Sequence, residues 1–275
     1  MNPETLTKSA FLALTLLLSS QTAMPQQTPE SGEIASFLHI AGAQLPNIDK
    51  NQQSSMASNI AGAQTRIGDL AGALSTVRAV ESEEGRVFAT GFVASAVAWQ
   101  ENVQLAIDLI QKSAAKNDQT KAVDYSFVAQ QLAGKHAFDE SLKVAQLIAD
   151  GPGFFGKTNR LVETLMGIQT KQWEARDWAG AEATVKQALD AVERETADPY
   201  TQEFADTMPA GLYCEITNTL SREGNRTEAS AVVERIYPMV AAARTSEIRQ
   251  ALLYQLSIAQ INLGRFKQRS TRPSN

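Results

Sequence analysis

Cysteine and histidine are nearly absent from this chain of 275 residues, which contains one Cys and two His. A single cysteine, Cys214, excludes an intramolecular disulfide, and two histidines cannot supply a three-histidine metal site or an HExxH motif. We therefore interpret Cys214 as a buried structural thiol and His39 and His136 as core or surface side chains. The sequence predicts neither a metal ion nor a cofactor.

Positive charge and aromatic residues are also sparse. The chain has 25 Lys and Arg against 30 Asp and Glu, a formal net charge of −5, and only 7% aromatic residues. Because nucleic-acid binding requires a clustered basic surface, no nucleic-acid partner is expected. The apolar fraction of 43% with only nine Pro favours helices over sheets, and the length suits one large domain or two ordinary ones.

Only a short apolar run is present near the N-terminus, AFLALTLLL at residues 10–18. It is too short to cross a bilayer, which takes about 20 residues. A lysine precedes the run and small, polar and Pro-containing residues follow it, which is the layout of a secretory signal peptide. We predict a signal peptide over residues 1–23 and an exported chain, periplasmic or secreted from a bacterium, without stable membrane insertion of the mature form. A buried N-terminal helix is the alternative.

A pattern of aliphatic and small residues recurs along the rest of the chain. It is aligned on six predicted turns: Gly68, Glu101, His136, Arg176, Gly224 and Gly264. A large aliphatic residue stands eight positions before each turn: Ile60, Val93, Val128, Ile168, Ile216 and Leu256. Four turns are followed by a helix-capping residue: Asp69, Asn102, Asp177 and Asn225. Each unit therefore reads as a helical hairpin whose apolar side must be covered by its neighbours.

Three segments carry a family resemblance: RIGDLAGALSTV, EARDWAGAEATVKQAL and SREGNRTEASAVVERI resemble tetratricopeptide repeats (TPR). The first two turn intervals, 33 and 35 residues, are close to the family unit of about 34. The resemblance implies an all-α fold, a right-handed α-solenoid of stacked antiparallel helix hairpins. We expect five to six hairpins over residues 54–266, after a linker and capping helix at 24–53 and before a flexible tail at 267–275.

The resemblance also implies a binding surface. In this family the first helices line a concave groove, and residues two, three and six positions before the turn tend to face it. The corresponding residues are Arg66, Ser95, Trp99, Gln130, Thr170, Trp173, Glu174, Asn218 and Arg222. The two tryptophans either anchor a bound segment or pack between adjacent repeats. The expected function is a noncatalytic scaffold for a protein or peptide partner in a cell-envelope or secretion assembly.

One motif favours a different function. The segment GPGFFGKT, Gly151 to Thr158, matches the phosphate-binding pattern G-x-x-x-x-G-K-[ST]. That loop works when a buried strand precedes it, whereas the preceding SLKVAQLIAD fits the second helix of a repeat. The alternative to a scaffold is an enzyme, either a nucleotide-binding protein that uses this loop or a hydrolase whose carboxylates act on an envelope polymer.

Overall fold

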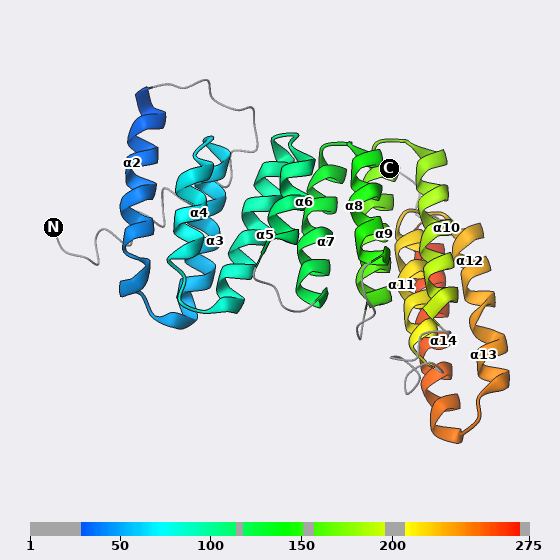
Figure 1. Ribbon diagram of the computed structural model, residues 1–275. Coiled ribbons are helices and arrows are strands. Elements are labelled where there is room, and N and C mark those ends of the chain that lie inside the picture. Colours follow the sequence, from blue (N-terminus) through cyan, green and yellow to red (C-terminus); the bar gives the residue numbers. More distant parts are fainter. Residues whose placement is uncertain (1–28, 114–117, 151–156, 196–206, 270–275) are drawn as a thin grey trace. The chain divides into compact units, whose positions relative to one another are not determined.

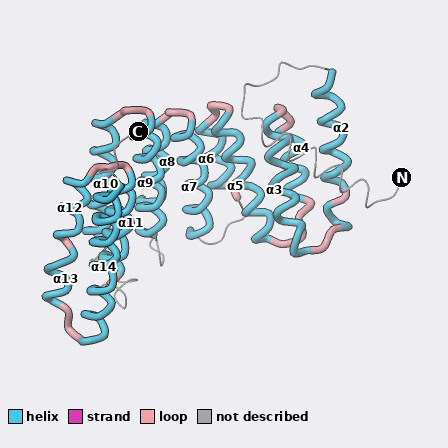
Figure 2. The backbone as a smooth tube through the Cα atoms, turned by 180° about the vertical axis from the view of Figure 1, so that it is seen from behind, coloured by secondary structure: helices cyan, strands magenta, loops and turns pink. Residues whose placement is uncertain are grey.

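The computed structural model describes residues 29–113, 118–150, 157–195 and 207–269 of the chain. Every regular element in these ranges is a helix and none is a strand (Figure 2). The predicted all-α class is therefore confirmed for the described part of the chain. The expected signal peptide at residues 1–23 lies outside it.

The chain divides into two compact units, Met1–Gln131 and Leu132–Asn275, so that the division falls within helix α7. The elements of unit 1 are α2 (Pro29–Ala43), the 3-10 helix η1 (Leu45–Asn47), α3 (Lys50–Arg66), α4 (Leu70–Arg78), α5 (Glu83–Trp99), α6 (Val103–Gln111) and most of α7 (Asp118–Gly134) (Figure 1). Helix α3 packs against its hairpin partner α4 and against the next first helix, α5, while α2 covers α3 and α4. Helix α2 lies within residues 24–53, where a linker and a capping helix were expected.

Unit 2 holds the remaining helices. They are α8 (Phe138–Asp150), α9 (Lys157–Glu174), α10 (Trp178–Glu195), α11 (Met208–Arg222), α12 (Arg226–Glu234), α13 (Ile236–Ala242) and α14 (Ser246–Arg269). Helix α9 packs against α8, α10 and α11, and α11 packs in turn against α12 and α14. Each first helix of unit 2 therefore contacts helices of both its own hairpin and the next one.

Five of the six predicted turns share one backbone conformation. Gly68 and Gly224 have φ of 87° and 85°, and Glu101, His136 and Arg176 have φ of 67°, 62° and 65°. This left-handed region favours glycine, so three turns hold a side chain where it is disfavoured. The recurrence of one turn geometry confirms these five predicted turn positions.

Hydrogen bonds explain why the turns are alike. At the first turn the amide of Gly68 donates to the carbonyl of Thr65 at 2.9 Å, and that of Asp69 donates to Gln64 at 2.9 Å. This pair of bonds is the Schellman motif, which satisfies carbonyls that the end of a helix leaves unpaired. The same pair of bonds follows α5, α7, α9 and α11. Each hairpin is therefore closed by the backbone itself, whichever residue occupies the turn.

The predicted caps are confirmed in three of four cases. The side chains of Asp69, Asn102 and Asp177 accept hydrogen bonds from backbone amides three residues later, at 2.9, 3.2 and 3.0 Å. Asn225 does not cap α12 with its side chain and instead donates from Nδ2 to Glu228. The side-chain amide nitrogen of Asn225 is thus bound to Glu228, three residues later.

The sixth predicted turn is wrong. Gly264 lies within α14, which runs without a break from Ser246 to Arg269, into the segment expected to be a flexible tail. The aliphatic residue eight positions earlier, Leu256, is nevertheless buried, as are its five equivalents in the other repeats. The aliphatic periodicity was therefore sufficient to predict burial but not to predict that the chain turns.

Candidate functional site

Certain residues that precede each turn lie along one side of the first helix of the hairpin. Arg66, Gly62, Asn59 and Ser55 lie 2, 6, 9 and 13 residues before Gly68, a spacing that places them along one face of α3. We call these four positions of a first helix its pre-turn face. Several of the predicted groove residues belong to it.

In unit 1 the pre-turn face becomes aromatic on α5 and α7. Phe88, Phe92 and Trp99 occupy it on α5 with 41%, 36% and 36% of their surface exposed, and Phe127 on α7 is 39% exposed. The rings of Phe88 and Phe92 are 5.1 Å apart, and those of Phe92 and Phe127 are 6.1 Å apart. We call Phe88, Phe92 and Phe127 the aromatic cluster; it exposes ring surface that a monomeric protein normally buries.

A buried acid lies beside the aromatic cluster. Asp124 precedes Phe127 by one turn of α7 and is 2% exposed, and its Oδ2 has no hydrogen-bond partner among the described residues. Burial raises the pKa of this carboxyl to about 8. A Cβ at Gly91 of α5 would stand 2.1 Å from Asp124 Oδ1, so the glycine makes room for the acid. The absence of a side chain at Gly91 of α5 therefore leaves space for the buried carboxyl group of Asp124.

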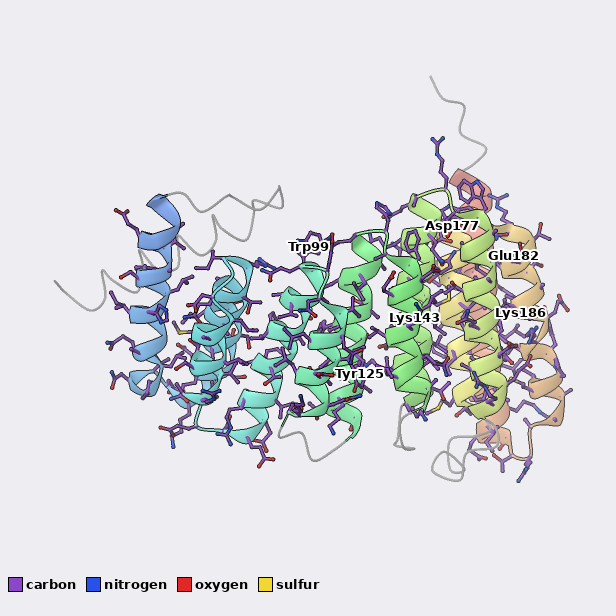
Figure 3. All side chains as sticks on the ribbon, turned by 45° about the horizontal axis from the view of Figure 1, so that its top comes forward. Trp99, Tyr125, Lys143, Asp177, Glu182 and Lys186 are labelled. Carbon is purple, nitrogen blue, oxygen red and sulfur yellow. The ribbon has the colours of Figure 1, made fainter. Side chains whose placement is uncertain are left out.

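The four groove residues predicted in unit 1 are all accessible at least in part. Arg66 and Gln130 are exposed and Ser95 is half-buried, while Trp99 lies exposed at the end of α5 (Figure 3). Gln130 Nε2 donates to Ser126 Oγ at 3.4 Å. Ser95 and Trp99 share the pre-turn face of α5 with the phenylalanines, so the predicted residues extend the aromatic cluster toward the turn.

In unit 2 the same face is polar. Glu174 is exposed and its Oε2 lies 2.7 Å from Nζ of Lys171. The remaining predicted residues are half-buried at Thr170, Trp173 and Asn218 and exposed at Arg222. On α11 the face also carries Glu215, whose pKa is raised by burial and by the nearby Glu163 of α9. The pre-turn face is thus aromatic on α5 in unit 1 and polar on α9 and α11 in unit 2.

Trp173 has an aromatic neighbour that the sequence analysis missed. Its ring lies 4.5 Å from that of Trp178, at an interplanar angle of 72°, and Trp178 is 52% exposed. Trp178 is the first residue of α10, directly after the capping Asp177, a position outside the groove pattern. The groove pattern also omits the three phenylalanines, because it covers only positions two, three and six before the turn. Phe92 and Phe127 lie nine positions before their turns and Phe88 lies thirteen.

The phosphate-loop motif follows a helix. Residues 151–156 of the motif lie outside the described residues, but α8 ends at Asp150, and Lys157 and Thr158 begin α9. The segment before the loop is therefore helical and lacks the strand that a phosphate-binding loop requires. Thr158 is 8% exposed, so the motif's hydroxyl residue is buried in α9.

Cys214, His39 and His136 lie in three separate places. Cys214 is buried, as predicted; its Sγ donates to the carbonyl of Gln255 at 3.0 Å, and burial raises the pKa of the thiol to about 11. His39 Nε2 lies 2.9 Å from Asp69 Oδ2, and His136 is exposed at its turn. In the part of the chain that the structure describes, no three His, Cys, Asp or Glu side chains are grouped to hold a metal ion.

Neither a membrane-spanning helix nor a known relative identifies the function. Among the described residues, no helix is both long and apolar enough to cross a membrane. Comparison of the chain with protein-family models, curated proteins and solved structures finds no match.

Proposed function

We propose that this protein is a noncatalytic scaffold that binds segments of other proteins, built as a right-handed α-solenoid of TPR-like hairpins. Support for the architecture comes from five hairpin turns of one geometry and from the contacts of α3 with α5 and of α9 with α11. Repeats of this kind contact mainly their neighbours and leave a continuous row of first helices accessible.

The aromatic cluster of unit 1 is the observation that carries the binding proposal. Phe88, Phe92 and Phe127 contact one another and remain 36–41% exposed. Aromatic side chains bury a large area on contact at low cost in conformational entropy, which is why they act as anchors in interfaces. Trp99 on the same face of α5 extends the surface, so a partner segment would lie along α5 and reach α7.

The cellular setting of the proposal rests on the sequence of residues 1–23. We place the mature protein in the periplasm or outside a bacterial cell, as part of an envelope or secretion assembly. The helix that leads into residues 151–156 favours the scaffold over a nucleotide enzyme, since α8 stands where the strand would be needed.

A selected peptide tests the binding surface. Peptides chosen from a displayed dodecapeptide library on the purified mature protein are synthesised, and their Kd is measured by fluorescence anisotropy. Phe92→Ala should weaken binding at least tenfold, because it removes the ring between Phe88 and Phe127. Tyr254→Ala removes a ring that is 65% exposed on α14 and should change the Kd less than twofold. Failure to select any peptide, or equal effects of the two variants, would contradict the proposal.

Nucleotide binding is measured with the same protein preparation. Titration with magnesium ATP should give no saturable binding, and Lys157→Ala should change nothing. Tight binding that depends on magnesium and is lost in Lys157→Ala would replace the scaffold by the nucleotide enzyme.

A further inference from the structure

A small pocket in unit 2 lies beside the Trp173–Trp178 pair. Helices α9 and α10 and the start of α12 enclose about 150 Å³. The side chains that define its chemistry are Gln169, Trp173, Trp178, Glu182, Asn225 and Glu228. Figure 3 shows Asp177 and Glu182 following one another along the start of α10, and Lys186 lies one turn beyond.

Gln169 lines this pocket and has an unpaired acceptor. The side chain is 1% exposed, and its Nε2 donates to Glu223 Oε2 at 2.7 Å. Because a carboxylate only accepts, the amide nitrogen must face Glu223, and Oε1 is left without a partner among the described residues. A buried acceptor without a donor is destabilising, so a ligand that donates a hydrogen bond to Gln169 Oε1 would remove this cost.

Two carboxylates also line the pocket, beside the amide of Asn225 and the indole N–H groups of Trp173 and Trp178. Glu228 accepts from Asn225 Nδ2, and Glu182 makes no hydrogen bond or ion pair within the described ranges. Neither Lys186, one turn along α10, nor Arg226, next to Asn225, lines the pocket. The pocket is thus lined by two carboxylates and, among the described residues, by no Lys or Arg side chain.

The aromatic walls favour the same kind of ligand. Trp173 and Trp178 meet at 72° with their centroids 4.5 Å apart, and Trp178 is 52% exposed. The face of an indole ring attracts a cation, and the attraction grows when the cation is removed from water. A flat cation with several N–H donors would satisfy the rings, the carboxylates and Gln169 Oε1 together.

We propose that this pocket binds a guanidinium group, supplied by an arginine side chain of a partner protein. A cavity of about 150 Å³ is large enough for a molecule the size of benzene, to which the planar guanidinium is comparable. The planar fork of N–H donors also matches carboxylate oxygens better than a point-like ammonium does. The proposal concerns a different surface from the aromatic cluster, so the two can fail separately.

The test uses the mature protein with Trp99→Phe, so that fluorescence reports only Trp173 and Trp178. N-acetyl-argininamide should bind saturably and at least tenfold more tightly than N-acetyl-citrullinamide, its neutral counterpart. Glu228→Gln should weaken binding of the arginine compound at least tenfold. Glu234→Gln, which neutralises an exposed carboxylate on the same helix, should change it less than twofold.

Three outcomes would overturn the proposal. Equal binding of the two compounds would show that charge is not recognised, and an unchanged affinity in Glu228→Gln would place the ligand elsewhere. No binding of either compound would mean that the pocket holds only water.

The source of the guanidinium is decided with a blocked five-residue peptide that has arginine at its centre between glycine and serine. Binding at least tenfold tighter than that of the single residue supports a partner segment, whereas equal binding favours a free guanidine compound.

Discussion

Two hairpins of the molecule, α3–α4 in unit 1 and α9–α10 in unit 2, are built on the same internal bonds. Thr76 Oγ1 donates to Gln64 Oε1 at 2.7 Å, and Thr184 Oγ1 donates to Gln172 Oε1 at the same distance. All four side chains are buried, and each bond joins the first helix of its hairpin to the second. The polar bond therefore serves the hairpin and not a ligand.

The same two hairpins differ in their other side chains. Where α3 carries the small Ala61 and Thr65, α9 carries Gln169 and Trp173 at the same distances before the turn. The residue after the cap changes from leucine to Trp178. These are the positions that line the pocket of unit 2. The buried Gln–Thr pair and the residues that line the pocket thus occupy separate positions, which lets one framework present different surfaces.

The largest expected effect on stability concerns helix α7 of unit 1, which differs from both of these hairpins at one buried position. Asp124 of α7 stands where α3 and α9 carry Met56 and Thr164. Burial raises its pKa from 3.8 to about 8, so between these values the folded chain keeps a proton that the unfolded chain has released. The free energy of unfolding should fall as the pH rises through this window, by up to about 1.4 kcal/mol per pH unit.

Urea unfolding at pH 5, 6, 7 and 8 measures this slope. Asp124→Asn should remove the corresponding part of it and should unfold at higher urea than the parent protein at pH 8. Asp139→Asn removes an exposed carboxyl on α8 and should leave the slope as it was. An Asp124→Asn protein with the parental slope would show that this carboxyl is ionised in the folded state.

A smaller effect tests whether the two polar bonds are equivalent. Gln64→Ala and Gln172→Ala each remove a buried partner of a threonine hydroxyl, and each should lower the free energy of unfolding by about 1–3 kcal/mol. Gln187→Ala, on the exposed side of α10, should change it by less than about 0.5 kcal/mol. If only one of the two substitutions lowers the free energy of unfolding, the glutamine–threonine bond has the same geometry in both hairpins but does not stabilise both.

The smallest expected effect has opposite signs in the two hairpins. Gly68 and Arg176 occupy the same turn position with φ of 87° and 65°. Gly68→Ala should destabilise the protein by about 1 kcal/mol, because alanine is disfavoured at positive φ. Arg176→Gly should stabilise it by a few tenths of a kcal/mol to about 1 kcal/mol, reduced by the extra freedom of glycine in the unfolded chain. Thermal unfolding followed by circular dichroism compares both variants, and effects of the same sign would contradict this account.

The success of the sequence analysis depended on how local each feature is. Five turns were predictable because the capping residue and the turn lie next to each other in the chain, as at Asp69 and Asp177. Gly264 failed because the same local pattern also suits the interior of a helix, and α14 continues through it. Asn225 failed because Glu228 competes for its side chain, an interaction that the capping pattern does not consider.

The candidate sites depended on distances across helices. The aromatic cluster requires Phe127 of α7 to reach Phe92 of α5, and the sequence spacing within either helix does not indicate that contact. The unpaired acceptor of Gln169 is visible only once Glu223, on the next hairpin, has taken its amide nitrogen. The single predicted aromatic of this region, Trp173, was identified without its neighbour Trp178.

Helix formation, hairpin turns and the buried aliphatic stripe follow from interactions between residues a few positions apart, and these are written directly in the order of the side chains. The exposure of the phenylalanines, the buried carboxyl of Asp124 and the pocket around Gln169 arise where separate helices meet. Burial and hydrogen-bond pairing depend on every neighbour in space, and some of those neighbours lie far away in the chain, as Phe92 and Phe127 do.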